Sequence, residues 1–145
     1  MKNKWLKRYF VDSLAGMALG LFSTLIIGLI IKQIGSFFPV IDASIENPAT
    51  HLVVLSTIGQ FFVKIGQILT VLTGAGIALG VANSLGVPKL VLYASALTGT
   101  IGAYATGFIS GSIVTQTGAI LLSGPGDPLG ALVAALAGAE VGRLV

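Results

Sequence analysis

The chain has 145 residues, of which 54% are hydrophobic and 9% charged, and its mean hydropathy is +0.98. Soluble domains carry about 25% charged residues, so this composition excludes an ordinary soluble fold. One histidine and no cysteine exclude disulfides, a zinc cluster and a Cys–His nucleophile pair. We therefore expect an all-α, polytopic transmembrane helical bundle with neither a metal site nor a cofactor.

Residues 1–12 form a basic flank that predicts a cytoplasmic amino terminus. The net charge of +3 could suggest nucleic acid, but the basic residues do not form such a surface. Positive charges beside aromatic anchors before an apolar run are typical of a cytoplasmic membrane flank. The residues are Lys2, Lys4, Lys7 and Arg8, with Trp5, Tyr9 and Phe10 among them. A cleaved signal peptide is the alternative, but the apolar run is too long and residues 36–48 offer no small-residue cleavage site.

The first two spans are predicted at residues 13–32 and 65–84. A polar connection rich in breakers, residues 36–48, follows the first and fits an outer loop. Residues 50–84 contain no proline and would measure about 52 Å as one helix, which exceeds the roughly 30 Å hydrocarbon core. We expect this stretch to bend, tilt or divide, with 50–64 as an amphipathic helix in the interface or along a cavity. Its polar face comprises Thr50, Thr57, Gln60, Lys64 and Gln67.

The second half of the chain predicts two further spans, at 90–108 and 128–145. The turn before the first contains Gly86 and Pro88 and leaves Lys89 on the cytoplasmic side. Residues 110–124 are apolar but short, which is typical of a re-entrant segment. The last helix begins after Asp127, a good N-cap, and returns Arg143 to the cytoplasm. This gives four spans with both ends inside; if 110–124 crosses fully, there are five.

Small residues recur at four-residue spacing, which in lipid lets helix backbones approach closely. We expect these pairs to serve helix packing, with a role in solute binding as the alternative. The pairs are Gly16 with Gly20, Gly76 with Gly80, Gly107 with Gly111, and Gly138 with Gly142.

Polar residues inside apolar segments give the candidate site, because a buried charge in a bilayer is costly and is kept for a reason. Glu140 and Arg143 can pair on one face of the last helix, either as an interfacial ion pair or as a gate. The polar face at Gln60 and Lys64 is either interfacial or a cavity wall. A broken segment exposes backbone groups to a ligand, as in secondary transporters. The candidate substrate-binding residues are Gln116, Asp127, Thr115, Glu140, Arg143, Lys64 and Gln60.

Two phrases carry a resemblance: "THLVVLSTIGQFFVKIGQILTVLTGAGIALGVANSLGVPKLV" and "GPGDPLGALVAALAGAEVGRLV". The chain resembles the membrane-embedded IIC component of the bacterial sugar phosphotransferase system, in the group that includes perfringolysin regulator-like proteins. The resemblance implies a permease in a bacterial inner membrane that is not itself an enzyme, because separate cytoplasmic components would phosphorylate the sugar. Family members are about twice as long, so we expect this chain to be an amino-terminal half or to assemble as a dimer. No substrate residue of the family carries over to a position here.

Three functions fit these features. The first is the permease component of a sugar phosphotransferase-type transporter, with the lipid bilayer, a sugar-like solute, cytoplasmic phosphotransferase components and a second copy as partners. The second is a membrane regulator or scaffold that transports nothing, and the third is a small oligomeric pore.

Overall fold

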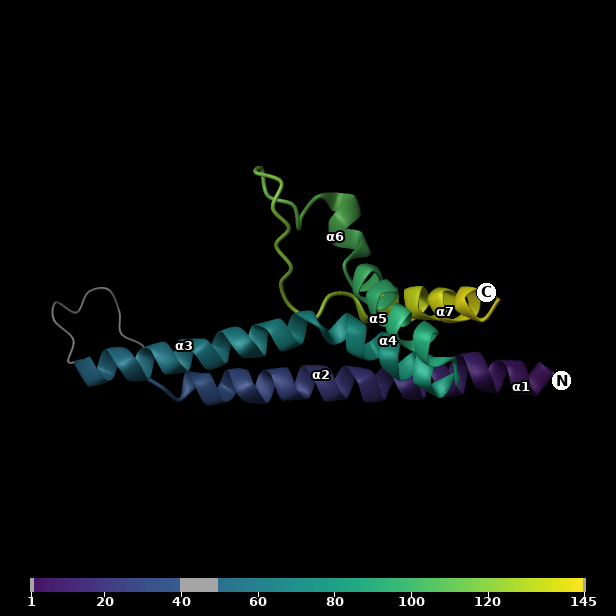
Figure 1. The fold of residues 1–145 in the computed structure, drawn as a ribbon, viewed down its shortest axis with the longest axis horizontal. Helices are drawn as coiled ribbons and strands as arrows, with labels where there is room; N and C mark the ends of the chain where they lie inside the picture. The colour runs from purple at the N-terminus through teal and green to yellow at the C-terminus, as the bar shows by residue number, and fades with distance from the viewer. Residues whose placement is uncertain (1, 40–49, 145) are drawn as a thin grey trace.

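The computed structural model describes residues 2–39 and 50–144, and their regular structure is helical throughout (Figure 1). The elements are α1 (Lys2–Leu6), the π-helical η1 (Lys7–Asp12), α2 (Ser13–Ser36), α3 (Thr50–Val71), α4 (Thr73–Ser84), α5 (Lys89–Ala103), α6 (Ala105–Ser110) and α7 (Pro128–Leu144). The all-α prediction is confirmed. The predicted loop at 36–48 lies largely outside the described residues.

The backbone of the molecule is a long antiparallel helix pair. The chain is helical from α1 through η1 to the end of α2, and α3 and α4 return alongside it (Figure 1). The basic flank is therefore helical and continuous with the first apolar helix. This pair carries both of the described helices that are long and apolar enough to cross a bilayer, Asn3–Ser36 and His51–Val71.

Glycines hold the two long helices at close range. A Cβ built on Gly35 would lie 2.6 Å from the carbonyl oxygen of Gly59, and one on Gly66 would lie 2.6 Å from that of Gly28. Further along the pair, Gly16 meets Gly80 and Gly20 meets Gly76. The packing predicted for these last four glycines is confirmed, and it follows from the four-residue spacing, which aligns them on one face of each helix.

The return helix divides at Leu72, whose backbone (φ −78°, ψ 4°) departs from helical values. The sequence predicts a division of 50–84, but between residues 64 and 65, and that point lies inside the continuous helix α3. The polar face suggested that boundary, yet lysine and glutamine are good helix formers and do not interrupt a helix. The point at which a polar face stops along the sequence therefore does not mark the end of a helix.

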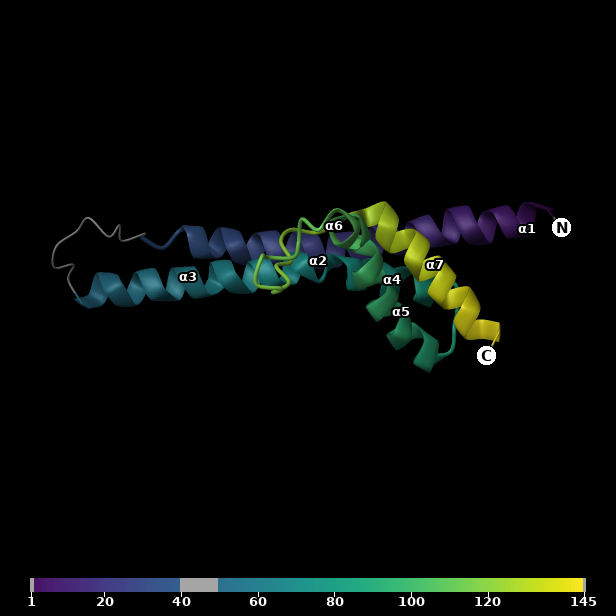
Figure 2. The ribbon, with the colours of Figure 1, turned by 90° about the horizontal axis from the view of Figure 1, so that it is seen from above.

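The shorter helices α5 and α7 pack against α4 and against each other (Figure 2). Their shared core is built from small and branched side chains of all three helices, and Gly102 lies against Gly130. The helices contain 12 (α4), 15 (α5) and 17 (α7) residues. The buried core residues are Ile77, Ala78, Val81, Leu85, Ala103, Tyr104, Ala131, Leu132, Ala135 and Ala139.

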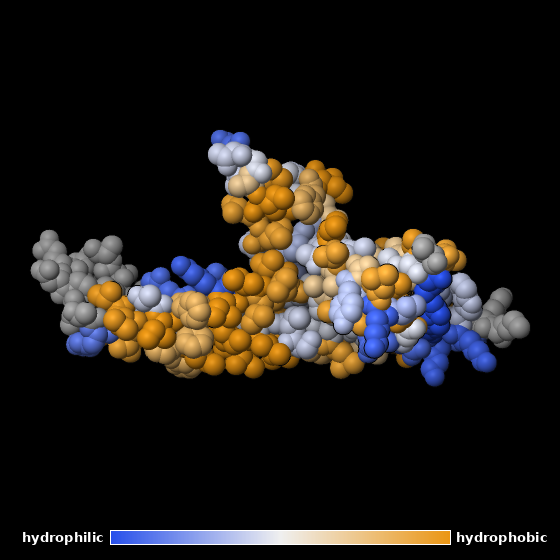
Figure 3. Space-filling model, viewed as in Figure 1, coloured by the Kyte–Doolittle hydropathy of each residue, from blue (hydrophilic) through white to orange (hydrophobic). Residues whose placement is uncertain are grey.

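Large apolar side chains cover the outer surface of α2 and α3 (Figure 3). Burial inside the chain is slight, at 17% of the most apolar window of each long helix. Such a surface is unsuited to water and suited to lipid tails. Examples on α2 are Leu19, Phe22, Ile26 and Ile30, and on α3 they are Val54, Ile58, Phe61 and Ile68.

Candidate functional site

Between α6 and α7 the chain forms a non-helical hairpin, residues 111–126, which we call the arm. Its two sides are joined by backbone hydrogen bonds from Thr115 N to Ala119 O (2.9 Å) and from Leu121 N to Ile113 O (2.8 Å). Left-handed glycines make its turns, with φ of 79° at Gly118 and 70° at Gly124. The arm projects away from the long helix pair (Figure 1). The predicted break after α6 is therefore a hairpin.

Thr115 and Gln116 lie at the tip of the arm. The Thr115 hydroxyl accepts a hydrogen bond from Ala119 N at 3.0 Å and lies 2.9 Å from the hydroxyl of Thr117. Gln116 is exposed. The threonines thus support the turn itself, and the glutamine amide is left to face outward.

Asp127 ends the arm and caps α7. Its Oδ1 accepts a hydrogen bond from Leu129 N at 3.0 Å, and Pro128 is the first helical residue. The predicted N-cap is confirmed, because the carboxylate satisfies one of the amides that a helix start leaves without a partner.

Tyr104 fixes the base of the arm, and the sequence analysis missed it. Its side chain is 5% exposed, and its hydroxyl lies 2.6 Å from Gly124 O and 3.1 Å from Val71 O. A phenol has one proton, so it donates to one of these carbonyls at a time. Because Val71 ends α3 and Tyr104 separates α5 from α6, three interruptions of the chain meet at this hydroxyl. The available signal was a tyrosine amid the small residues of the predicted third span.

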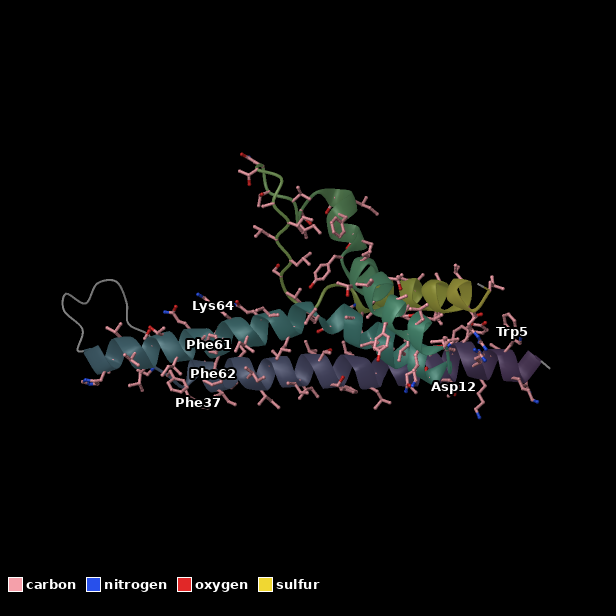
Figure 4. The ribbon with its side chains drawn as sticks, in the orientation of Figure 1. Trp5, Asp12, Phe37, Phe61, Phe62 and Lys64 are labelled. Carbon is pink, nitrogen blue, oxygen red and sulfur yellow. The ribbon has the colours of Figure 1, made fainter. Side chains whose placement is uncertain are left out.

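The polar face of α3 lines two connected hollows beside the arm. One, of about 380 Å³, is lined by Ser36 and Phe38 from the end of α2 and by Ser56, Gln60, Lys64 and Gln67. The other, of about 470 Å³, lies between Lys64, Gln67 and Leu122 of the arm. Since the two share Lys64 and Gln67, we treat them as one groove, called the α3 groove. Figure 4 shows Lys64 on the side of α3 from which the arm rises.

A stacked aromatic pair adjoins the α3 groove through Phe38, which lines it. The rings of Phe38 and Phe62 are stacked, with centroids 6.2 Å apart and planes 11° from parallel. The groove thus combines an ammonium group, two amides and two hydroxyls with a largely apolar wall, to which Val63, Ile68 and Leu72 also contribute. Such a mixture suits a polar solute that also has apolar faces.

Glu140 and Arg143 lie at the other end of the molecule, beside the basic flank. Their predicted pairing is confirmed, with Arg143 Nη1 3.8 Å from Glu140 Oε1. Burial, and after it the nearby Glu140 carboxylate, raises the pKa of Tyr9, and the Arg8 guanidinium donates a hydrogen bond to Leu85 O at 3.1 Å. Arg8 therefore satisfies a carbonyl at the carboxyl end of α4, where a positive charge is favoured. Polar side chains gather at this end in Figure 3.

The structure does not bring the seven candidate residues into one site. Gln60 and Lys64 line the α3 groove, whereas Thr115 and Gln116 lie at the arm tip. Asp127 caps a helix, and the Glu140–Arg143 pair belongs to the polar end of the molecule. The α3 groove is the strongest candidate for solute binding, because two of them, Gln60 and Lys64, line the same hollow.

Comparison with known families and proteins gives one match. Residues 11–145 match the family described as Phosphotransferase system, EIIC. No curated protein and no solved structure matches the chain. The family match covers nearly all of the chain and agrees with the apolar helices that suit a bilayer. The chain therefore belongs to the EIIC family of the phosphotransferase system, whose members are the membrane permease components of sugar transport.

Proposed function

We propose that this chain moves a polar solute, a sugar of unspecified identity, along the α3 groove. The observation that carries the proposal is the position of Lys64 within the apolar helix Thr50–Val71, about two-thirds of the way along it, with Gln60 one turn before it and Gln67 one turn after it. All three side chains are exposed. A lysine at the centre of a bilayer costs about 2.5–3.5 kcal/mol on insertion scales, so such residues face water-filled cavities or protein.

The chemistry of the groove fits a sugar. Amides and hydroxyls both donate to and accept from sugar hydroxyls, and the ammonium group donates. Phe38 offers an apolar edge to the C–H face of a pyranose ring. A hollow of about 380 Å³ lies within the range of small-molecule sites, which is roughly 300–1,000 Å³.

The distribution of charge favours a cytoplasmic position for the polar end of the molecule, where the amino terminus and the end of α7 lie. The amino terminus, the end of α7 and the α4–α5 turn lie together, since Arg8 contacts Leu85 and Tyr9 interacts with Glu140 (Figure 2). This end carries Lys4, Lys7, Arg8 and Arg143, and Lys89 follows the turn. The positive-inside rule then puts both ends in the cytoplasm, next to the separate components that would phosphorylate the sugar.

The helix lengths suggest how the second half sits in the bilayer. The sequence predicts four crossings, but α5 and α7 measure about 22 and 26 Å, and they pack beside α4 instead of α3. We propose that α5 enters from the cytoplasmic face, that the arm turns within the membrane, and that α7 returns to the same face. The four-crossing arrangement differs in carrying the arm to the outer face.

Solute binding by the purified protein in lipid nanodiscs tests the function. Thermal stabilisation across a panel of sugars should reveal at least one ligand. Lys64→Gln should then weaken its affinity about tenfold, because a hydrogen bond from a charged group contributes roughly 1.5–3 kcal/mol. Lys7→Gln removes the same charge from the exposed flank and should leave affinity unchanged.

Absence of a response to any sugar by the unaltered protein would refute the transport proposal. It would favour the alternative, a membrane regulator without transport activity, for which a co-purifying protein and an unaffected Lys64→Gln variant are expected.

A further inference from the structure

A second lysine lies beside the α3 groove, on the other long helix. Lys32 belongs to the last third of α2, and a Cβ built on Gly66 would lie 2.7 Å from both its backbone nitrogen and its Cβ. Gly66 follows Lys64 by two residues in α3. Because this glycine lets the backbones of α2 and α3 approach so closely, Lys32 and Lys64 lie at nearly the same depth along the helix pair.

Both lysines open onto one continuous surface. A hollow of about 680 Å³ is lined mainly by α2, through Leu29, Ile30, Lys32, Gln33 and Ser36, and by Val63 of α3. Ser36 and Val63 also line the part of the α3 groove that contains Lys64. The hollow therefore adjoins the groove, and each of the two helices contributes one exposed ammonium group to the combined surface.

Positive charge is the only charge among the described residues that line these hollows. Their other polar side chains are neutral, namely Gln33, Ser36, Ser56, Gln60 and Gln67. The described acidic residues have other positions: Asp12 ends η1, Asp127 caps α7 and Glu140 pairs with Arg143. A negatively charged solute would complement two ammonium groups, and complementary charge selects one class of ligand over another.

We propose that the α3 groove selects an acidic sugar, a hexuronate or a related sugar carboxylate, and holds its carboxylate between Lys32 and Lys64. An ammonium group forms a shorter and stronger hydrogen bond with a carboxylate than with a neutral hydroxyl. The amides of Gln60 and Gln67 are left to exchange hydrogen bonds with the ring hydroxyls. This inference rests on the proposed function for its site and adds the class of solute that the site prefers.

Matched sugars test the charge while the ring stays the same. The protein in nanodiscs of zwitterionic phosphatidylcholine is titrated calorimetrically with galacturonate, glucuronate and mannuronate, and with the corresponding hexoses. At least one hexuronate should bind about tenfold more tightly than its hexose, because a charge-assisted hydrogen bond replaces a neutral one. The methyl ester of that hexuronate lacks the charge and should bind no more tightly than the hexose.

Removal of either lysine charge should reduce this preference. Lys32→Gln and Lys64→Gln should each lower the ratio of the two affinities several-fold, and the double variant should bind hexuronate and hexose alike. Lys7→Gln removes a charge from the exposed flank, so it is the matched control and should keep the full preference. If the variants in the helix pair fold poorly, added salt should still weaken hexuronate binding to the unaltered protein and spare the hexose.

An anionic lipid headgroup offers a phosphate to the same two lysines, so a second set of nanodiscs contains phosphatidylglycerol. The hexuronate should keep its preference there. Loss of the preference, together with retention of phosphatidylglycerol that depends on Lys32 and Lys64 in native mass spectra, would assign the lysines to a headgroup and overturn the proposal.

The selection of acidic sugars and the transport proposal fail separately. Equal affinity for hexuronates and hexoses, or a preference that survives in the double variant, refutes the selection and leaves transport supported. No binding of any sugar, acidic or neutral, refutes the transport proposal and this inference with it.

Discussion

A single hydroxyl group, that of Tyr104, contacts both the non-helical arm and the end of the long helix α3. Tyr104 is buried where α3, α5 and the returning arm all break off, and its hydroxyl lies within hydrogen-bond distance of carbonyls from Val71 and Gly124. A carbonyl released from its helix and buried without a donor is costly. The tyrosine thus both holds the end of α3 and anchors the returning end of the arm.

Tyr104→Phe should lower the free energy of unfolding by about 1 kcal/mol, because it removes one hydrogen bond made by a buried side chain. The larger effect should be on the arm, whose backbone amides should exchange hydrogen faster. Thermal unfolding in detergent and hydrogen-exchange mass spectrometry measure the two effects. Tyr93→Phe is the control, since Tyr93 is 68% exposed on α5. Equal exchange in the arm of both variants would argue against a role for Tyr104 in placing it.

At the scale of helices, glycine spacing was the most dependable guide in the sequence. Gly16, Gly20, Gly76 and Gly80 pack as their spacing predicts. The contact of Gly102 with Gly130 was missed because Gly102 has no glycine four residues away, and the one four residues before Gly130, Gly126, lies outside α7. Gly107 and Gly111 fit the spacing but form no helix contact: Gly107 lies against Ile113, and Gly111 ends α6 with φ 69°. The four-residue spacing of glycines therefore identifies a small-residue face on a helix. Whether that face forms a helix contact depends on whether another helix lies against it.

Gly16→Ala should destabilise the protein by about 1–3 kcal/mol, the usual cost of forcing an added methyl into a packed contact. The new Cβ would collide with the backbone carbonyl of Gly80, which cannot move without shifting α4. Gly107→Ala is the matched control, since its nearest neighbour is an Ile113 methyl at 2.8 Å, which can rotate aside. Thermal unfolding of both variants measures the difference. A stability gain at Gly16 would contradict the close approach of α2 and α4.

At the scale of the whole molecule, the sequence predicted the class but not the geometry. Charge-free stretches and the basic flank indicated a helical membrane protein, and α7 begins at Pro128 as expected. The position of the division, at Leu72, and the hairpin form of residues 111–126 were not predicted, because each adjoins a contact of the Tyr104 hydroxyl, across 33 and 20 residues, that spacing in the sequence does not reveal. The seven predicted site residues lie far apart in the structure for the same reason. Spacing in the sequence groups residues within one helix and says little about which helices contact each other.

Labelling of single cysteines with a membrane-impermeant maleimide tests the proposed topology. His51→Cys, near the start of α3, should react from outside the cell, and Lys89→Cys should react only after the cytoplasmic side is opened. Thr117→Cys at the arm tip should resist labelling from outside. Rapid labelling of Thr117→Cys in intact cells would instead support four complete crossings with the arm at the outer face.

The unbroken helix from the basic flank to the end of α2 has a mechanical consequence. This helix, Asn3–Ser36, contains 34 residues and spans about 51 Å. Because a helix is stiff over that length, a displacement of the end that carries Lys4 and Lys7 would be carried to Ser36 at the other end, where Ser36 borders the α3 groove. The charged end and the wall of the groove are thus coupled through a single continuous helix.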